Sequence, residues 1–111
     1  MPPRDWRLRV DDILDAIARI ERYVEGLTFE QFQGDQKTVD AVIRNFEVIG
    51  EAVRHVVADQ ESLPTGIPWA DIAGMRNILI HEYFGVDLNI IWHTIVEDLP
   101  ALRDQLQRSI S

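Results

Sequence analysis

Three polar side chains interrupt an otherwise apolar helical segment, RNILIHEYFG: Arg76, His81 and Tyr83. A histidine exchanges protons near neutral pH, and an arginine carries a permanent charge whose planar fork fits phosphate oxygens. Asn77 precedes His81 by four residues and so lies on the same side of a helix, where its amide can orient the imidazole. These residue types are the ones that proton transfer beside a bound phosphate would use.

The helical geometry places Arg76 in an unusual position. A helix turns by about 100° per residue, so Arg76 lies at the centre of an apolar stripe formed by Trp69, Ile72, Ala73, Leu79 and Ile80. Burying an unpaired guanidinium is costly, so Arg76 needs a carboxylate partner, a water-filled cleft or an anionic ligand. His81 lies about 140° around the helix from Arg76, so the two converge on one target only where the helix ends early or two chains combine.

Spacing alone favours structural roles for these residues. Arg76 can pair with a carboxylate of a neighbouring helix, for which Asp40, Glu47 and Glu51 are the candidates. His81 is then a surface or capping residue and Tyr83 closes the core. The other two histidines, His55 and His93, are expected to be structural or solvated. The three histidines have no metal-ligand spacing, so we expect neither a metal site nor a cofactor.

Composition limits the classes of protein. The 111 residues, of which 46% are hydrophobic, fit a single domain spanning residues 1–111. No apolar run approaches the roughly 18 residues of a membrane span, and no secretory signal is present, so we expect a cytoplasmic protein. The net charge is -8, and Lys37 is the only lysine. A broad cationic field for nucleic acid is therefore excluded, and any nucleic-acid chemistry must be local.

The apolar spacing is helical along nearly the whole chain. The first predicted helix begins after Asp5 and ends at Gly26, the stretch LTFEQFQGD predicts a short helical turn, and Asp35 or Thr38 opens a second long helix. Gly50 lies within the second stripe, which predicts a close helix contact there. The apolar stripes of these two long helices comprise Trp6, Val10, Ile13, Leu14, Ile17, Ile20 and Val24, and Val39, Val42, Ile43, Phe46, Ile49, Val53 and Val56 or Val57.

The second half of the chain begins with the predicted loop DQESLPTGIP. A third helix is expected to start near Pro68 and a fourth after Asp87, with a kink or restart near Asp98 because Pro100 cannot continue a regular helix. The apolar face of the fourth comprises Leu88, Ile91, Trp92, Ile95, Leu99, Leu102, Leu106 and Ile110. The predicted fold is all-α, an antiparallel bundle of four or five helices.

Two segments carry a resemblance to a known family. The piece IPWADIAGMRNILIHEYFGVDLNIIWHTIVEDLPALRDQL resembles the C-terminal half of the HepT-like family of small helical HEPN proteins, and FEVIGEAVRHV resembles the helix that precedes it. The most specific element is Arg-x-x-x-x-His-x-Tyr, which Arg76, His81 and Tyr83 complete here. Asn77 directly follows the arginine, as is usual in the family.

The resemblance implies a HEPN-like helical bundle that forms a homodimer. It also implies a metal-independent endoribonuclease that is the toxin of a toxin–antitoxin pair. The partner in such a pair is a small nucleotidyltransferase, which silences the toxin by adenylylating the motif tyrosine, here Tyr83. On this interpretation Arg76 and His81 are catalytic, Asn77 orients the histidine, and RNA is the substrate.

Two other functions are compatible with the residues. One is a non-catalytic helical module that binds a nucleotide or docks a nucleotidyltransferase, which the net charge of -8 favours. The other is a purely structural dimerising bundle. The complete motif disfavours both.

Overall fold

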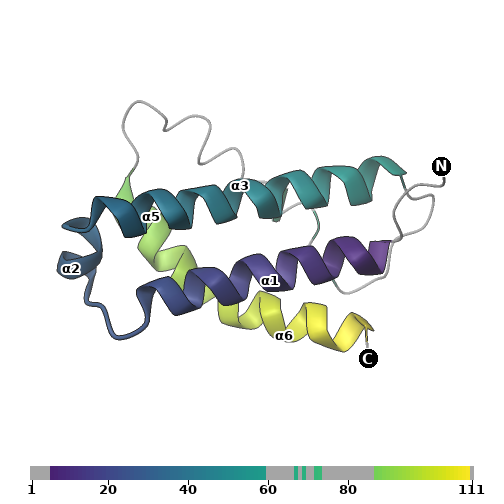
Figure 1. Ribbon diagram of the computed structural model, residues 1–111. Helices are drawn as coiled ribbons and strands as arrows, with labels where there is room; N and C mark the ends of the chain where they lie inside the picture. The colour runs from purple at the N-terminus through teal and green to yellow at the C-terminus, as the bar shows by residue number, and fades with distance from the viewer. Residues whose placement is uncertain (1–5, 60–66, 68, 70–71, 74–86, 111) are drawn as a thin grey trace.

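The computed structural model describes residues 6–59, 67, 69, 72–73 and 87–110 (Figure 1). These described residues contain no β-strand, so the prediction of an all-α fold is confirmed. The elements are α1 (Trp6–Val24), α2 (Phe29–Gln33), α3 (Gln36–Asp59), α5 (Leu88–His93), a π-helical turn η1 (Thr94–Asp98) and α6 (Leu99–Ile110).

Helix α1 follows the apolar stripe predicted for it. It ends shortly before Gly26, whose φ of +76° is a left-handed conformation that glycine adopts without strain. The predicted cap, Asp5, lies outside the described residues. The stripe is fully buried at Val10, Ile13, Ile17 and Ile20, and Trp6, Leu14 and Val24 pack against the same core while partly exposed.

Helix α2 is the predicted short turn, and a capping box fixes its start. The Gln31 backbone N–H donates to Thr28 Oγ1 at 3.2 Å, and the Thr28 backbone N–H donates to Gln31 Oε1 at 2.9 Å. Phe32 is fully buried, and its ring centroid lies 5.2 Å from that of Trp92, while Phe29 lies 6.1 Å from Trp92. These aromatic contacts attach α2 to α5.

Asp35, rather than Thr38, caps α3. Its carboxylate accepts the Thr38 backbone N–H at 3.2 Å and the Thr38 hydroxyl at 2.7 Å. The hydrogen bonds from the Thr38 side chain and backbone lower the pKa of Asp35. Gly50 is buried within α3. The predicted stripe is buried at Val39, Val42, Phe46, Ile49, Val53 and Val56, whereas Ile43 is half-buried.

The last helical segment, residues 88–110, changes its helical pitch near the position where Pro100 predicted an interruption. Asp87 caps α5 by accepting the Asn89 backbone N–H at 3.0 Å, as predicted. The turn that follows is π-helical, and its last hydrogen bond joins the Leu99 N–H to the Thr94 carbonyl. A proline has no N–H for the carbonyl four residues back and its ring crowds that carbonyl, so a widened turn is a physical solution. The predicted break near Asp98 is therefore confirmed as a π turn.

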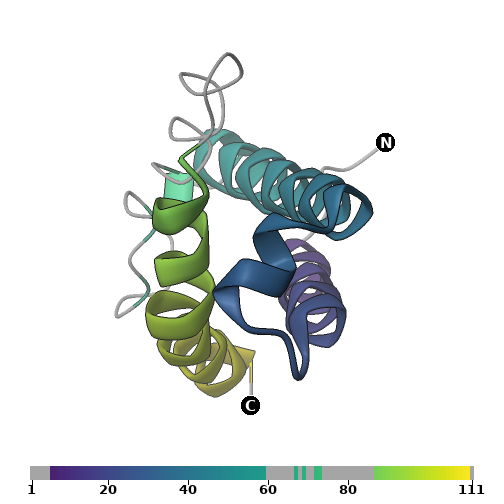
Figure 2. The same ribbon diagram turned by 90° about the vertical axis from the view of Figure 1, so that its left-hand side faces the viewer.

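The helices pack as two layers. Helix α1 runs antiparallel to α3 beside it, and α5, η1 and α6 form the opposite layer, with α2 crossing one end (Figures 1 and 2). Side chains of all these elements meet in one core between the layers, and Ile67 and Ile72 also belong to it. This arrangement agrees with the predicted antiparallel bundle.

A partly buried ion pair joins α1 to α6. Arg103 Nη1 lies 2.7 and 2.6 Å from the two carboxylate oxygens of Glu21, and these hydrogen bonds raise the pKa of Arg103. The two side chains are 36% and 30% exposed. Water therefore screens the pair only in part.

Arg103→Met is expected to lower the free energy of unfolding by roughly 0.2–1 kcal/mol, the usual range for solvent-accessible pairs. Urea denaturation of Arg103→Met, Glu21→Gln and the double variant measures the coupling between the two side chains. Arg22→Met, at an exposed position of α1, is the control. Additive effects of the two single changes would show that the pair contributes nothing.

Candidate functional site

The four residues assigned to the site from the sequence are Arg76, Asn77, His81 and Tyr83, and all lie outside the described residues. The structure therefore does not test their mutual geometry. The structure does describe residues that flank the motif in the chain: Trp69, Ile72 and Ala73 before it, and the residues from Asp87 onward after it.

The residues that precede the motif pack on the core. Trp69, Ile72 and Ala73 have helical backbone geometry, in agreement with a helix that begins near Pro68. Ile72 is only 1% exposed, and Trp69 and Ala73 pack against the core while partly exposed. The first turn of the apolar stripe that was predicted to contain Arg76 thus faces the core.

The residues that follow the motif are held in place by the start of α5. Asp87 caps that helix, Leu88 packs against the core, and Ile91 is 3% exposed. The chain is held on the core at Ala73 and again at Leu88. The motif must lie within the stretch that joins these two anchors.

The three carboxylates proposed as partners of Arg76 lie on α3 and contact side chains of that same helix. Gln36 Nε2 donates to Asp40 Oδ1 at 2.7 Å, and Arg44 Nη1 lies 3.8 Å from Glu47 Oε2. Glu51 contacts both Arg54 and His55. These contacts leave the choice among the three carboxylates open.

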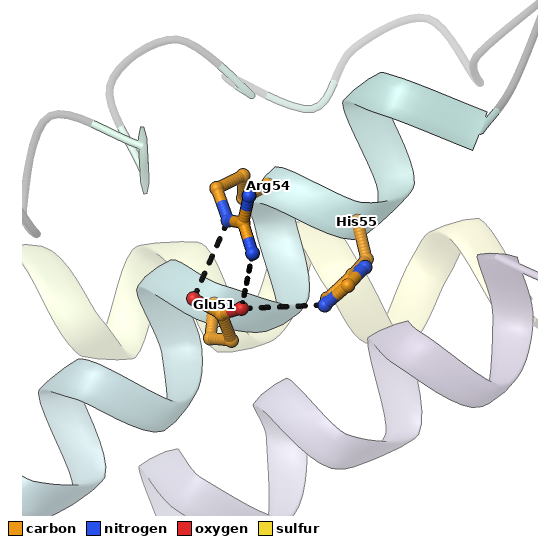
Figure 3. Close-up of polar contacts among 3 residues, drawn as sticks. All are labelled: Glu51, Arg54 and His55. Atoms are coloured by element: carbon orange, nitrogen blue, oxygen red, sulfur yellow. Dashed lines mark hydrogen bonds and ion pairs between the residues drawn. The ribbon is translucent and has the colours of Figure 1, made fainter.

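Glu51 is the centre of a cluster that the sequence interpretation missed. Arg54 Nη2 and Nε lie 2.5 and 3.4 Å from its two oxygens, and His55 Nε2 lies 3.3 Å from Oε1 (Figure 3). The hydrogen bond from Arg54 to Glu51, aided by the charge of Glu51, raises the pKa of Arg54. The spacing of three and four residues on a helix was the available signal. His55 thus has a carboxylate partner on its own helix.

A cleft of about 320 Å³ lies between α1 and α3. Asp12 is half-buried and lines this cleft, whereas the adjacent Asp11 is exposed. The charged side chains that line the cleft are the arginines Arg9, Arg19 and Arg44 and the carboxylates Asp12, Asp15, Glu47 and Glu51.

Arg9 differs from the other arginines of the cleft. Its Nε is buried and has no hydrogen-bond acceptor among the described residues. A buried donor without an acceptor costs about 1–3 kcal/mol, and more when the group is charged.

Within the described part of the chain, no group of three or more histidines and carboxylates is arranged to hold a metal ion. Among the helices described, none combines the length and the apolar character that a membrane crossing requires.

Comparison with known proteins places the chain in a family. The family model described as "Ribonuclease HepT-like" matches residues 13–109, a range that includes the Arg76–Tyr83 motif. A Thermococcus cleftensis protein named "Probable ribonuclease HepT" is 43% identical over 99 residues, which cover 89% of this chain and 90% of that protein. A "Putative RNase" of Caldanaerobacter subterraneus subsp. tengcongensis is 46% identical over 88 residues, covering 79% and 78%. No solved structure matches the chain. On these similarities the chain belongs to the HepT-like ribonuclease family.

Proposed function

We propose that the protein is a metal-independent endoribonuclease and the toxin of a toxin–antitoxin pair. The observation that carries the proposal is the complete motif Arg76-x4-His81-x-Tyr83 inside a chain of the HepT-like ribonuclease family. The net charge of -8 requires that the phosphate be held by a few local cations. Arg76 supplies such a cation.

The proposed reaction is a transesterification within one RNA strand. A base takes the proton of a ribose 2′-hydroxyl, and that oxygen attacks the adjacent phosphorus. The bond from phosphorus to the 5′-oxygen of the next nucleotide breaks, an acid protonates this leaving oxygen, and a 2′,3′-cyclic phosphate remains. His81 acts as the proton-transfer group, and Arg76 stabilises the negative charge that builds up on the pentavalent phosphate. Asn77 holds the imidazole of His81 in position.

The angular separation of Arg76 and His81 on one helix supports a site shared by two protomers. In a symmetric dimer, the same surface of each copy meets at the two-fold axis. Two arginines and two histidines then line one cleft, and each phosphate meets an arginine and a histidine from different chains. Gly74, on the same face as His81, leaves room for the second backbone.

The protein is expected to be a homodimer at micromolar concentration. Light scattering coupled to size exclusion measures its mass against the 12.8 kDa of one chain. Arg76→Ala is expected to change this mass little if the arginine serves the substrate, whereas a bulky residue at Gly74 is expected to weaken the dimer. A monomer under these conditions would contradict the shared site.

The proposed partner is a nucleotidyltransferase antitoxin that adenylylates Tyr83. Tyr83 is only two residues after His81 in the chain, which supports a location of its phenol oxygen near the proposed catalytic residues. A small nucleotidyltransferase in the neighbouring reading frame would support the pairing.

The test of the proposed activity is incubation of the purified protein with single-stranded RNA. Cleavage supports the endoribonuclease. Binding of RNA or of a nucleotide without cleavage supports the second candidate, a non-catalytic module, which the net charge of -8 favours because strong negative charge repels a bulk RNA substrate.

A further inference from the structure

The last helical segment, residues 88–110, packs against different helices in its two halves. Helix α6 lies along α1, to which the ion pair of Arg103 and Glu21 joins it, whereas α5 contacts α2 (Figure 1). The contact with α2 is aromatic, and the ring centroids of Trp92 and Phe32 are 5.2 Å apart. The two halves of one helical segment therefore need apolar faces that point in different directions.

The spacing of the apolar residues in this segment fits only one direction. They recur three or four residues apart, so in a regular α-helix they would form a single stripe. The π turn η1 changes this arrangement, because the Leu99 N–H bonds to the Thr94 carbonyl five residues back instead of the Ile95 carbonyl four residues back. The turn thus holds one additional residue. Since each residue advances a helix by about 100°, α5 is rotated by about this angle relative to α6 when compared with a regular helix.

The burial of Thr94 agrees with this rotation. In a regular helix Thr94 would lie about 140° around the axis from Leu99, yet both side chains are buried, at 8% and 0% exposed. The Thr94 hydroxyl donates to the Ile90 carbonyl at 2.9 Å, so the buried polar group has a partner. Val96 is 51% exposed, which leaves an apolar side chain of the turn at the surface.

Pro100 supplies the physical reason for the π turn. A proline has no N–H, and its ring crowds the carbonyl four residues back, which here belongs to Val96. Without the proline, a regular turn would gain a hydrogen bond to that carbonyl and would align the apolar residues of both halves in one stripe. The local sequence would then favour a straight helix.

We propose that Pro100 is a positioning residue for RNA cleavage, because the π turn that it imposes sets the rotation of α5 and so the place where the chain carrying the motif returns to the core. The inference rests on the proposed ribonuclease function. Tyr83 is only five residues before Leu88, the first residue of α5. A change of register by one residue moves each Cα atom of α5 by about 3.8 Å, the spacing of consecutive Cα atoms. A misplacement of about 1 Å can lower the rate of an enzyme by about 10²-fold.

Pro100→Ala in the full chain tests the proposal with two measurements. Nuclear Overhauser contacts between the ring protons of Trp92 and Phe32 report the rotation of α5, and cleavage of saturating single-stranded RNA gives kcat. The substitution is expected to remove the ring contacts and to lower kcat by about 10- to 10²-fold, because α5 is turned away from α2.

A second variant, which combines Pro100→Ala with deletion of Val96, is expected to restore both properties. A π turn is equivalent to one residue inserted into an α-helix, so removing a residue lets α5 and α6 keep their observed directions in a regular helix. Val96 is suited to deletion because its side chain is half-exposed. The combined variant is expected to regain the ring contacts and most of kcat. A proline that acted only on stability would give the opposite result, since the deletion would add to the damage.

Ala101→Gln is the matched control, because Ala101 is exposed beside Pro100 and the variant keeps the backbone N–H. It is expected to change neither measurement. Ring contacts that persist in Pro100→Ala, an unchanged kcat after their loss, or no recovery in the combined variant would each overturn the proposal. Failure of the unmodified protein to cleave RNA would overturn the proposed function and with it the catalytic role of Pro100, whereas the ring contacts would still show whether Pro100 sets the register.

Discussion

The purified protein is expected to cleave single-stranded RNA in the presence of a metal chelator, and His81→Ala is expected to lower the rate by roughly 10²-fold or more. A positioned proton-transfer group typically raises the rate by 10²–10⁴-fold. Water is a poor replacement, because its pKa lies much further from neutral pH than that of an imidazole. Gel analysis of a labelled oligoribonucleotide measures the rate, and detection of a 2′,3′-cyclic phosphate product identifies the proposed chemistry.

The chain supplies its own control for this experiment. His93 is an exposed histidine at the end of α5, so His93→Ala removes an imidazole without touching the motif and is expected to keep full activity. Arg76→Ala is expected to lose activity as His81→Ala does. Arg76→Lys is expected to recover only part of it, since lysine keeps the charge but loses the bidentate fork. Equal cleavage by all variants would trace the activity to a contaminating nuclease, and loss of activity with the chelator would contradict a metal-independent mechanism.

Local signals in the sequence were sufficient for most of the fold. The caps at Asp35 and Asp87 and the end of α1 before Gly26 each depend on a few neighbouring residues. The effect of Pro100 is also local, because the missing N–H and the ring act on the preceding turn. The sequence predicted that the helix changes near Asp98, but it did not distinguish a π turn from a kink.

The features that the sequence interpretation missed depend on which helices become neighbours. Asp12 lines the cleft between α1 and α3, and nothing near it in the chain shows that α3 lies alongside. The same is true of the unpaired Nε of Arg9, whose burial results from the pairing of α1 with α3. Glu51 and His55, in contrast, are four residues apart on one helix, so their contact was accessible from spacing.

The candidate site combines both situations. The identities of Arg76, His81 and Tyr83 come from a short motif that local spacing displays completely. Their proposed convergence on one phosphate would depend on where the helix ends and on a second copy of the chain, and neither can be deduced from the spacing. This is why spacing alone favoured structural roles, and why the family relationship changed the interpretation.

Co-expression with the proposed nucleotidyltransferase partner is expected to add one or more adenylyl groups to Tyr83 and to abolish ribonuclease activity. In this reaction the phenol oxygen of Tyr83 attacks the α-phosphorus of ATP, pyrophosphate leaves, and the phenol proton passes to solvent or to a base of the transferase. The product is a bulky phosphodiester with one negative charge beside Arg76. The arginine is then paired within the protein, and the RNA phosphate is excluded by repulsion and by size.

Intact-mass spectrometry and peptide mapping measure this modification, and the two tyrosines of the chain make the mapping decisive. Tyr23 is partly exposed on α1, at 39%, so it is accessible to a transferase that selects only for exposed phenols. Modification of Tyr83 with Tyr23 left bare shows selection by the motif, whereas modification of both shows none. Tyr83→Phe keeps the apolar contacts of the ring, so it is expected to retain cleavage and to escape silencing by the partner. If the co-expressed protein is silent while Tyr83 carries no adenylyl group, occlusion of the cleft by the bound partner replaces modification as the mechanism, because a steric block needs no phenol oxygen and would silence Tyr83→Phe equally well.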